Sequence, residues 1–134
     1  MLATILVAIW LMITSPPSDL EIMAFRNTAP MYLTKESASY HLVAARAAGI
    51  VHHVRPALIL AIAYHESRYI PTTRTPEPGQ RESCGVMTPI PKARCAREDM
   101  TLIGGYDAGA AHLQMWLDLC QGEARCALLA SAGG

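Results

Sequence analysis

Glu66 is the residue whose type and position most strongly suggest chemistry. It ends the apolar stretch AIAYHE, and on a helix of about 3.6 residues per turn it shares a face with Ile59, Ile62 and Ala63. Apolar surroundings and the negative end of the helix dipole both disfavour a charged carboxylate, so they favour the neutral acid. Because a neutral carboxyl can donate a proton to the leaving oxygen of a glycosidic bond, this position predicts a general acid.

Two other roles for Glu66 have to be weighed. The first is an ion pair that only holds the helix end, with Arg55, Arg68 or Arg74 as the partner. The second is a zinc-protease helix, because His65 and Glu66 are adjacent. That motif needs a second histidine where this chain has Tyr69, so the zinc reading is excluded.

The element that must hold Glu66 is a helix over residues 56–68. Pro56 is well tolerated in the first turn of a helix, and Pro71 stops the helix from continuing. An earlier helix is expected from the N-cap residue Thr34 to Gly49, or on to His53. Further helices are expected over residues 101–120, with a start at either residue 101 or 105, and over residues 124–130.

The remaining segments carry few periodic signals. Residues 19–30 show no clear period and are expected to lead into the domain, residues 72–83 are expected to form an exposed loop, and residues 83–95 are expected to be irregular because of Pro89 and Pro91. No sheet larger than a small β-hairpin is expected. The predicted fold class is mainly α, with irregular loops.

Composition limits the kind of protein and its partners. The chain has 134 residues, enough for one domain, with 51% hydrophobic and 16% charged residues. The formal net charge is zero and there is no basic run, so nucleic acid is excluded as a partner. We expect a monomer that needs no cofactor and no metal. Trp116 is expected in the core, with a sugar-stacking position at the edge of a cleft as the alternative.

The N-terminus forms a separate unit. Residues 1–13 are almost wholly apolar, which is too short to cross a bilayer comfortably and suits the apolar region of a secretory signal. No Lys or Arg precedes this run and no clean cleavage site follows it. We expect residues 1–18 to be a signal or anchor, with a helix packed onto the domain as the alternative, and residues 19–134 to form the domain.

The four cysteines are Cys84, Cys95, Cys120 and Cys126. They lack the close pair spacing of most zinc sites, so a metal site is disfavoured. Pairing of neighbours, Cys84 with Cys95 and Cys120 with Cys126, is the most economical arrangement if the compartment is oxidising. Four reduced, buried thiols in a cytosolic protein are the alternative.

Four short motifs follow one another in the second half of the chain: HESRYIP, CGVMTP, AGAAHL and ALLASAGG. Their order over residues 57–134 resembles the lytic transglycosylase family, the goose-lysozyme-like enzymes that cut peptidoglycan. In that family a helix ends in Glu-Ser and is followed by a loop and a small-Gly-Leu-Met-Gln turn. A helix matched here through Gly109 and Leu113 comes next, and then an Ala-Tyr-Asn-Ala-Gly-like segment.

The resemblance implies a lysozyme-like helical domain in which Glu66 is the catalytic residue. It implies that the substrate-binding residues are Ser67, Tyr69, Gly85, Val86, Met87, Thr88 and Ser131. Thr88 stands where the family usually has Gln, and Ser131 where it usually has Tyr. The chain also ends where the family normally continues with another helix, so the domain is expected to be truncated.

The implied reaction cuts the β-1,4 bond between N-acetylmuramic acid and N-acetylglucosamine and leaves a 1,6-anhydromuramoyl product. A single glutamate acts first as acid and then as base, with no metal and no cofactor. One rival is a hydrolytic muramidase that pairs Glu66 with Asp99 or Asp107. The other rival is a non-catalytic module that binds peptidoglycan or serves in assembly.

The implied partner is the glycan strand of peptidoglycan, alone or within a secretion, conjugation or phage apparatus that spans the cell envelope. The implied location is the cell envelope, with the protein periplasmic or secreted, tethered by residues 1–15, or associated with a phage.

Overall fold

The computed structural model describes residues 2–5, 18–28, 33–89 and 91–133. Most of the apolar N-terminal segment that was expected to be a signal or anchor therefore lies outside the described residues. Within the described ranges, no helix combines the length and the apolar character needed to cross a membrane.

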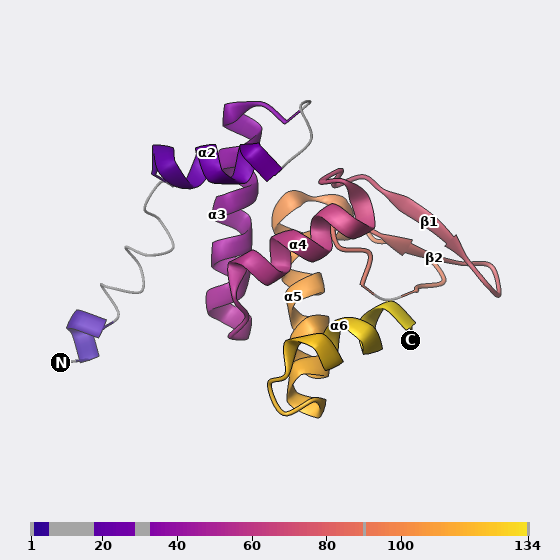
Figure 1. The fold of residues 1–134 in the computed structure, drawn as a ribbon. Helices are drawn as coiled ribbons and strands as arrows, with labels where there is room; N and C mark the ends of the chain where they lie inside the picture. The colour runs from indigo at the N-terminus through magenta and orange to yellow at the C-terminus, as the bar shows by residue number, and fades with distance from the viewer. Residues whose placement is uncertain (1, 6–17, 29–32, 90, 134) are drawn as a thin grey trace.

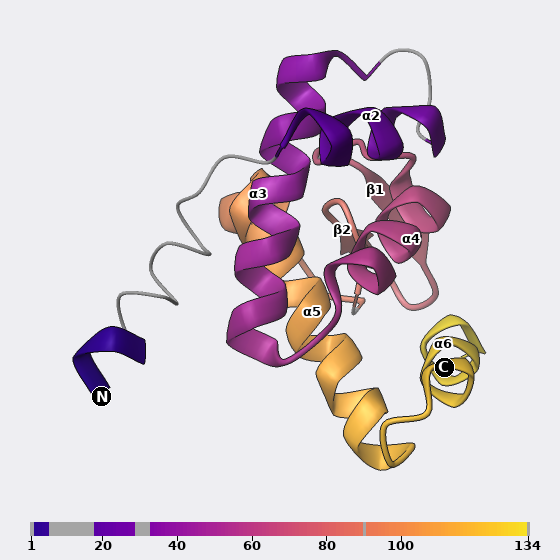
Figure 2. The same cartoon turned by 60° about the vertical axis from the view of Figure 1, so that its left-hand side comes forward.

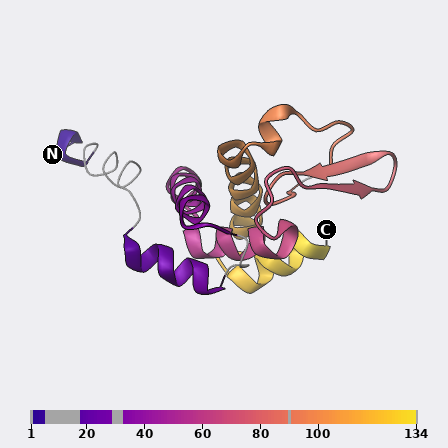
Figure 3. The same cartoon turned by 90° about the horizontal axis from the view of Figure 1, so that it is seen from above.

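The described chain is mainly helical with one two-stranded sheet, so the predicted fold class is confirmed. The helices α3 (Lys35–His52) and α5 (Leu102–Leu119) lie side by side, and α4 (Pro56–Ser67) crosses them on one face (Figures 1 and 3). The short helix α2 (Asp19–Thr28) covers one end of α3, as Figure 2 shows. The helix α6 (Ala124–Gly133) returns from the end of α5 toward α4.

The predicted helices have the caps that their sequences indicate. The Thr34 hydroxyl accepts a hydrogen bond from Ser37 N at 3.0 Å, and α3 ends at His53 in a left-handed conformation. At the start of α5, the Thr101 hydroxyl accepts from Gly104 N at 3.1 Å. These side chains satisfy backbone N–H groups that have no partner within their own helix.

Helix α2 forms within residues 19–30, where the sequence shows no clear period. Ser18 and Glu21 form a reciprocal capping box, in which Ser18 N donates to the Glu21 carboxylate at 2.7 Å and Glu21 N donates to the Ser18 hydroxyl at 3.2 Å. Ile22 and Phe25 of this helix are buried in the core. Burial of one face stabilises a helix whose period is weak in the sequence.

A β-hairpin corrects the expectation of an exposed loop over residues 72–83. Strand β1 (Arg74–Glu77) pairs antiparallel with β2 (Arg81–Cys84), with Arg74 opposite Cys84. The turn places Gly79 and Gln80 at positive φ angles of 77° and 59°. Most residues of both strands are polar, and only Ser83 and Cys84 are buried, so the strands lack an alternating hydrophobic pattern.

Both predicted cysteine pairings are confirmed: Cys84 is bonded to Cys95 and Cys120 to Cys126, with Cα–Cα distances of 6.2 and 5.8 Å. The first bond ties β2 to the irregular segment that precedes η1 (Arg97–Met100). The second closes the turn between α5 and α6. Paired cysteines indicate an oxidising extracellular or periplasmic compartment.

Removal of the Cys84–Cys95 bond by a double substitution to serine is expected to lower the free energy of unfolding by about 2–3 kcal/mol, because the closed loop restricts the unfolded chain. Urea denaturation followed by circular dichroism measures this loss. The Cys120→Ser, Cys126→Ser protein is the matched control for removing a disulfide. An unfolding free energy equal to that of the wild type would contradict the prediction.

The core between α3, α4 and α5 contains one buried polar pair. His41 Nδ1 and the Tyr106 hydroxyl are 2.6 Å apart, and their side chains are 2% and 0% exposed. Burial lowers the pKa of His41 to about 4 and raises the pKa of Tyr106. Both groups are therefore neutral near pH 7, and they share one hydrogen bond.

The buried histidine predicts loss of stability in mild acid. The folded-state pKa of about 4 lies below the ordinary value of 6.5, so the unfolded chain takes up the proton first as the pH falls. The contribution of His41 to the free energy of unfolding is complete above pH 6.5. It is lost between pH 6.5 and about 4, by at most about 3 kcal/mol. Urea denaturation at pH 7 and pH 4.5 measures the difference in unfolding free energy between the two pH values. The same difference in a His41→Gln protein would contradict the assignment of the loss to His41.

Candidate active site

Glu66 lies at the boundary of two hollows. A groove of about 500 Å³ runs between α4, the hairpin and α5. Its lining residues are Glu66, Glu77, Pro78, Arg81, Ser83, Met87, Thr88, Pro89, Pro91, His112, Trp116 and Ser131. We call it the Glu66 groove. A mostly apolar pocket of about 340 Å³ between α4 and α6 also contains Glu66 and Ser131. An extended ligand could therefore pass over Glu66 and contact both hollows.

The Glu66 carboxylate is more exposed than the sequence predicts. Ile59 and Ala63 of the same helical face are fully buried, whereas Glu66 in the last turn of α4 is exposed to the groove. The buried core ends one turn before Glu66, so the residue lies at the surface, where it lines both the groove and the apolar pocket. Its Oε2 accepts a hydrogen bond from the Thr88 hydroxyl at 3.0 Å, and no group in the described part of the chain donates to Oε1.

The arginines considered as ion-pair partners are engaged elsewhere or distant. Arg74 lies 3.5 Å from Glu82, and the Arg68 guanidinium lies over the Tyr64 ring at 4.4 Å. Arg55 stands at the N-cap position at the opposite end of α4, roughly 16 Å along the helix from Glu66. A simple ion pair therefore does not explain the position of Glu66.

Ser67 holds the end of α4 to the turn that carries Thr88. Its side chain is buried, and the hydroxyl oxygen lies 2.6 Å from the Val86 carbonyl and 3.0 Å from the Ala63 carbonyl. The single hydroxyl hydrogen can be donated to either of these backbone oxygens, and the Val86 carbonyl is the nearer one. Ser67 lies outside the lining of both hollows and positions Thr88 beside Glu66.

The same turn fits against two glycines of α5. Gly85 has a φ of 92°, and Val86 and Met87 are buried beneath the groove. A Cβ atom at Gly105 would lie 3.2 Å from Val86, and one at Gly109 would lie 2.8 Å from Met87 Cγ and closer still to its sulfur. The absence of side chains at these positions lets the turn approach the helix closely.

Tyr69 lies away from the groove. Its ring packs edge-on against Phe25 and His41, with centroids 5.0 and 5.5 Å apart, and only 5% of the residue is exposed. The structure therefore brings four of the predicted site residues together in the Glu66 groove: Glu66, Met87, Thr88 and Ser131. Ser67, Tyr69, Gly85 and Val86 lie outside its lining.

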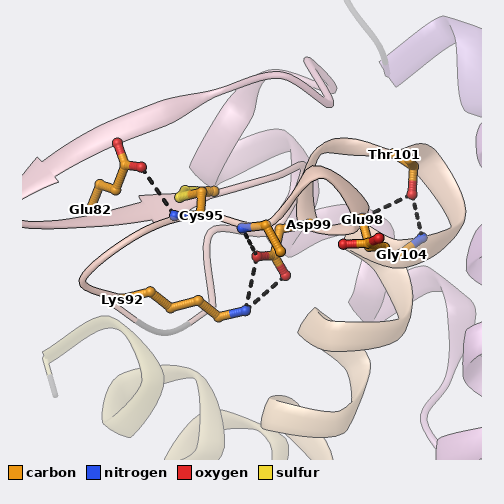
Figure 4. A network of polar contacts seen from close by, with 9 residues as sticks. Glu82, Lys92, Cys95, Glu98, Asp99, Thr101 and Gly104 are labelled. Atoms are coloured by element: carbon orange, nitrogen blue, oxygen red, sulfur yellow. Dashed lines mark hydrogen bonds and ion pairs between the residues drawn. A yellow bond between two sulfur atoms is a disulfide. The ribbon is translucent and has the colours of Figure 1, made fainter.

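A polar network holds the segment between β2 and α5 (Figure 4). The Lys92 ammonium donates to both Asp99 carboxylate oxygens at 2.8 and 2.9 Å, and Ala96 N donates to the same carboxylate. The hydrogen bond from Lys92 is the main cause that lowers the pKa of Asp99. Nearby, Cys95 N donates to Glu82 at 3.2 Å. Together with the disulfide, these contacts hold the segment that follows Thr88.

Neither carboxylate that the sequence suggests as a second catalytic group lines the groove. Asp99 is held by Lys92, and Asp107 lies 2.7 Å from His52 on α3. The second carboxylate in the groove is Glu77 of β1, which accepts a hydrogen bond from the Ser83 hydroxyl at 2.8 Å. Glu77 lies in residues 72–83, which were expected to form an exposed loop, so it was not among the predicted site residues. The Pro78-Gly79 pair at the turn was the available signal.

One cluster among the described residues has the spacing of metal ligands: Glu82 with Cys84 and Cys95. The two cysteines are bonded to each other, so neither offers a thiolate. The disulfide accounts for this cluster.

No protein-family model, curated protein or solved structure matches the chain.

Proposed function

We propose that this protein is a peptidoglycan lytic transglycosylase in which Glu66 is the catalytic acid and base. The observation that carries the proposal is the place of Glu66 at the boundary of two hollows, beside the Thr88 hydroxyl. The order of the four sequence motifs adds support, because Glu66, Met87, Thr88 and Ser131 from three of them meet in one groove.

The proposed reaction needs one carboxyl group that changes its protonation state. A glycan strand in the groove covers Glu66, and exclusion of water favours the neutral form of a carboxyl. The acid donates its proton to the oxygen that leaves with N-acetylglucosamine. The resulting carboxylate then takes the proton of the muramoyl 6-hydroxyl, whose oxygen attacks the anomeric carbon and closes the 1,6-anhydro ring. The proton is returned to Glu66, so the group is ready for another cycle.

The Thr88 hydroxyl has a clear part in this scheme. It donates to Oε2 and so fixes the orientation of the carboxyl group, which leaves Oε1 to face the glycosidic oxygen. Ser67 stabilises this arrangement, because its hydroxyl donates a hydrogen bond to the Val86 carbonyl in the turn that carries Thr88. Thr88 and Ser67 are therefore positioning residues in the proposed reaction.

A hydrolytic muramidase is the second candidate, and Glu77 is the observation that favours it. A hydrolase uses a second carboxylate as base or nucleophile, and Glu77 lies in the same groove as Glu66. In this version Glu77 takes a proton from water, and the product has an ordinary reducing end.

The two disulfides fit action in the cell envelope, where peptidoglycan lies. We propose that the protein is periplasmic or secreted and that its partner is the glycan strand, alone or as part of an envelope-spanning apparatus.

Mass spectrometry of fragments released from purified peptidoglycan tests the proposal. Fragments that end in 1,6-anhydromuramic acid are the expected result. Fragments with reducing ends would favour the hydrolase with Glu77. Binding of peptidoglycan by the folded protein with no release of fragments would contradict both enzymes and favour a binding module.

A further inference from the structure

The Cys120–Cys126 bond lies at the joint between α5 and α6, and it is the more exposed of the two disulfides. Cys126 is exposed and Cys120 is partly buried, whereas Cys84 and Cys95 are only 4% and 8% exposed. A thiol must reach a disulfide sulfur directly in order to reduce it, so access decides which bond opens first. The joint between α5 and α6 is therefore the accessible site for a reductant.

Helix α6 depends on this bond because little of the helix is buried. Among its residues whose burial is described, only Ala127 is buried, and Leu129 is 66% exposed. The hydrogen bonds at its start are local, from Cys126 N to the Glu123 carboxylate at 2.7 Å and from Ala127 N to the Glu123 carbonyl at 3.1 Å. Within the described ranges, no hydrogen bond or ion pair joins α6 to α4 or to the hairpin. A helix of 10 residues is too short to be stable in water by itself, so the crosslink to α5 is a large part of what holds it in place.

The position of α6 bears directly on the candidate active site, because the helix returns toward α4 (Figures 2 and 3). Leu128 and Leu129 form one wall of the apolar pocket beside Glu66, and Ser131 lines both that pocket and the Glu66 groove. If α6 moved away from α4, both hollows would lose this wall and Glu66 would be open to water on that side. Since exclusion of water favours the neutral acid, such a movement would weaken the proposed proton transfer.

We propose that the Cys120–Cys126 bond is a redox-sensitive clamp that holds α6 beside Glu66, and that a dithiol reductant opens it and lowers the catalytic activity. A thiolate of the dithiol attacks the exposed Cys126 sulfur, the bond to Cys120 breaks, and Cys120 leaves as a thiolate that takes up a proton. The second thiol of the reductant then attacks the mixed disulfide and releases Cys126. Two electrons and two protons of the dithiol thus pass to the two cysteines, and the dithiol is oxidised to a disulfide. This inference rests on the proposed function, because it adds regulation of the same site.

Treatment of the wild-type protein with increasing concentrations of dithiothreitol, a small dithiol, tests the clamp by three measurements. Alkylation followed by peptide mass spectrometry shows which bond has opened, and Cys120 and Cys126 are expected to react before Cys84 and Cys95. Hydrogen exchange of the amides of residues 124–131 is expected to rise at least about tenfold, while exchange in α3 stays unchanged. Release of fragments from peptidoglycan is expected to fall at least about tenfold and to recover when the bond is formed again.

The Cys120→Ser, Cys126→Ser protein is the matched control, since it lacks the bond without any reductant. It should show the raised exchange of α6 and the low release of fragments before treatment, and dithiothreitol should change neither. Circular dichroism verifies the fold of this variant, and the wild-type measurements decide the proposal if it does not fold.

Opening of the Cys84–Cys95 bond first, or unchanged exchange of α6 after reduction of the Cys120–Cys126 bond, would overturn the clamp. Unchanged release of fragments after that reduction would overturn the control of catalysis and leave the proposed function standing. Absence of fragments from the oxidised protein would overturn the proposed function and the control of catalysis with it. In that case the exchange measurement would still decide whether the bond holds α6.

Discussion

Replacement of Glu66 by glutamine is expected to reduce release of fragments from peptidoglycan by roughly 10³-fold or more, because one side chain serves as both acid and base. Glutamine keeps the size of the side chain, and its amide oxygen can still accept the hydrogen bond from Thr88. Since Glu66 is exposed, the free energy of unfolding should change by less than about 0.5 kcal/mol. Binding of peptidoglycan should persist.

Glu77→Gln is the matched control for this result. Glu77 lies in the same groove and is also hydrogen-bonded to a hydroxyl. Its replacement therefore removes one negative charge from the groove, as Glu66→Gln does. A transglycosylase should retain most of its activity in this variant, whereas a hydrolase that uses Glu77 should lose it. Cleavage by the Glu66→Gln protein at the wild-type rate would contradict the assignment of Glu66.

Gly109→Ala is expected to have the second large effect, through the turn that carries Thr88. Alanine in a helix is normally favoured over glycine by about 0.5–1 kcal/mol. Here the added carbon would lie 2.8 Å from Met87 Cγ, so overpacking should cost about 1–3 kcal/mol and reverse the sign. Displacement of Met87 also moves Thr88 relative to Glu66, and such a shift can reduce turnover on the order of 100-fold.

Thermal unfolding and fragment release measure the two consequences of Gly109→Ala. Ala111→Val, at an exposed position on the same helix, controls for a larger side chain on α5. A Gly109→Ala protein that is more stable than the wild type and equally active would show that Met87 moves aside without disturbing the site.

Local signals in the sequence predicted the helices that build the site. Pro56 marks the start of α4, and Thr34 and Thr101 mark the starts of α3 and α5 through their side-chain caps. Both disulfides followed from the order of the cysteines. In each case the interaction that fixes the element lies within one or two helical turns, or joins cysteines that follow one another in the sequence. The local sequence pattern is therefore enough to predict it.

Features that depend on distant contacts were not predicted. The helix α2 has a weak period of its own and gains stability from burial of Ile22 and Phe25. The hairpin has Pro76 within a short exposed strand, which removes the alternating pattern typical of strands. Glu77 reaches the groove only through this hairpin, for which the Pro78-Gly79 pair was the one signal in the sequence.

Ser67 illustrates a related limit. The family resemblance implied a contact of Ser67 with substrate, but successive residues on a helix point in directions about 100° apart. Glu66 therefore faces the groove while Ser67 faces the core and bonds to Val86. The exposure of Glu66 itself was also missed, because the number of turns covered by the core is set by the packing of α4 on its neighbours.

Digestion of peptidoglycan by the wild-type protein in water enriched in heavy oxygen tests the central claim most directly. If Glu66 activates the muramoyl 6-hydroxyl, the new anhydro ends take their oxygen from the sugar and contain no label. Mass spectrometry of the released fragments should therefore show unlabelled 1,6-anhydromuramoyl ends. Heavy oxygen at new reducing ends would show that water attacks the anomeric carbon, and would contradict a lytic transglycosylase.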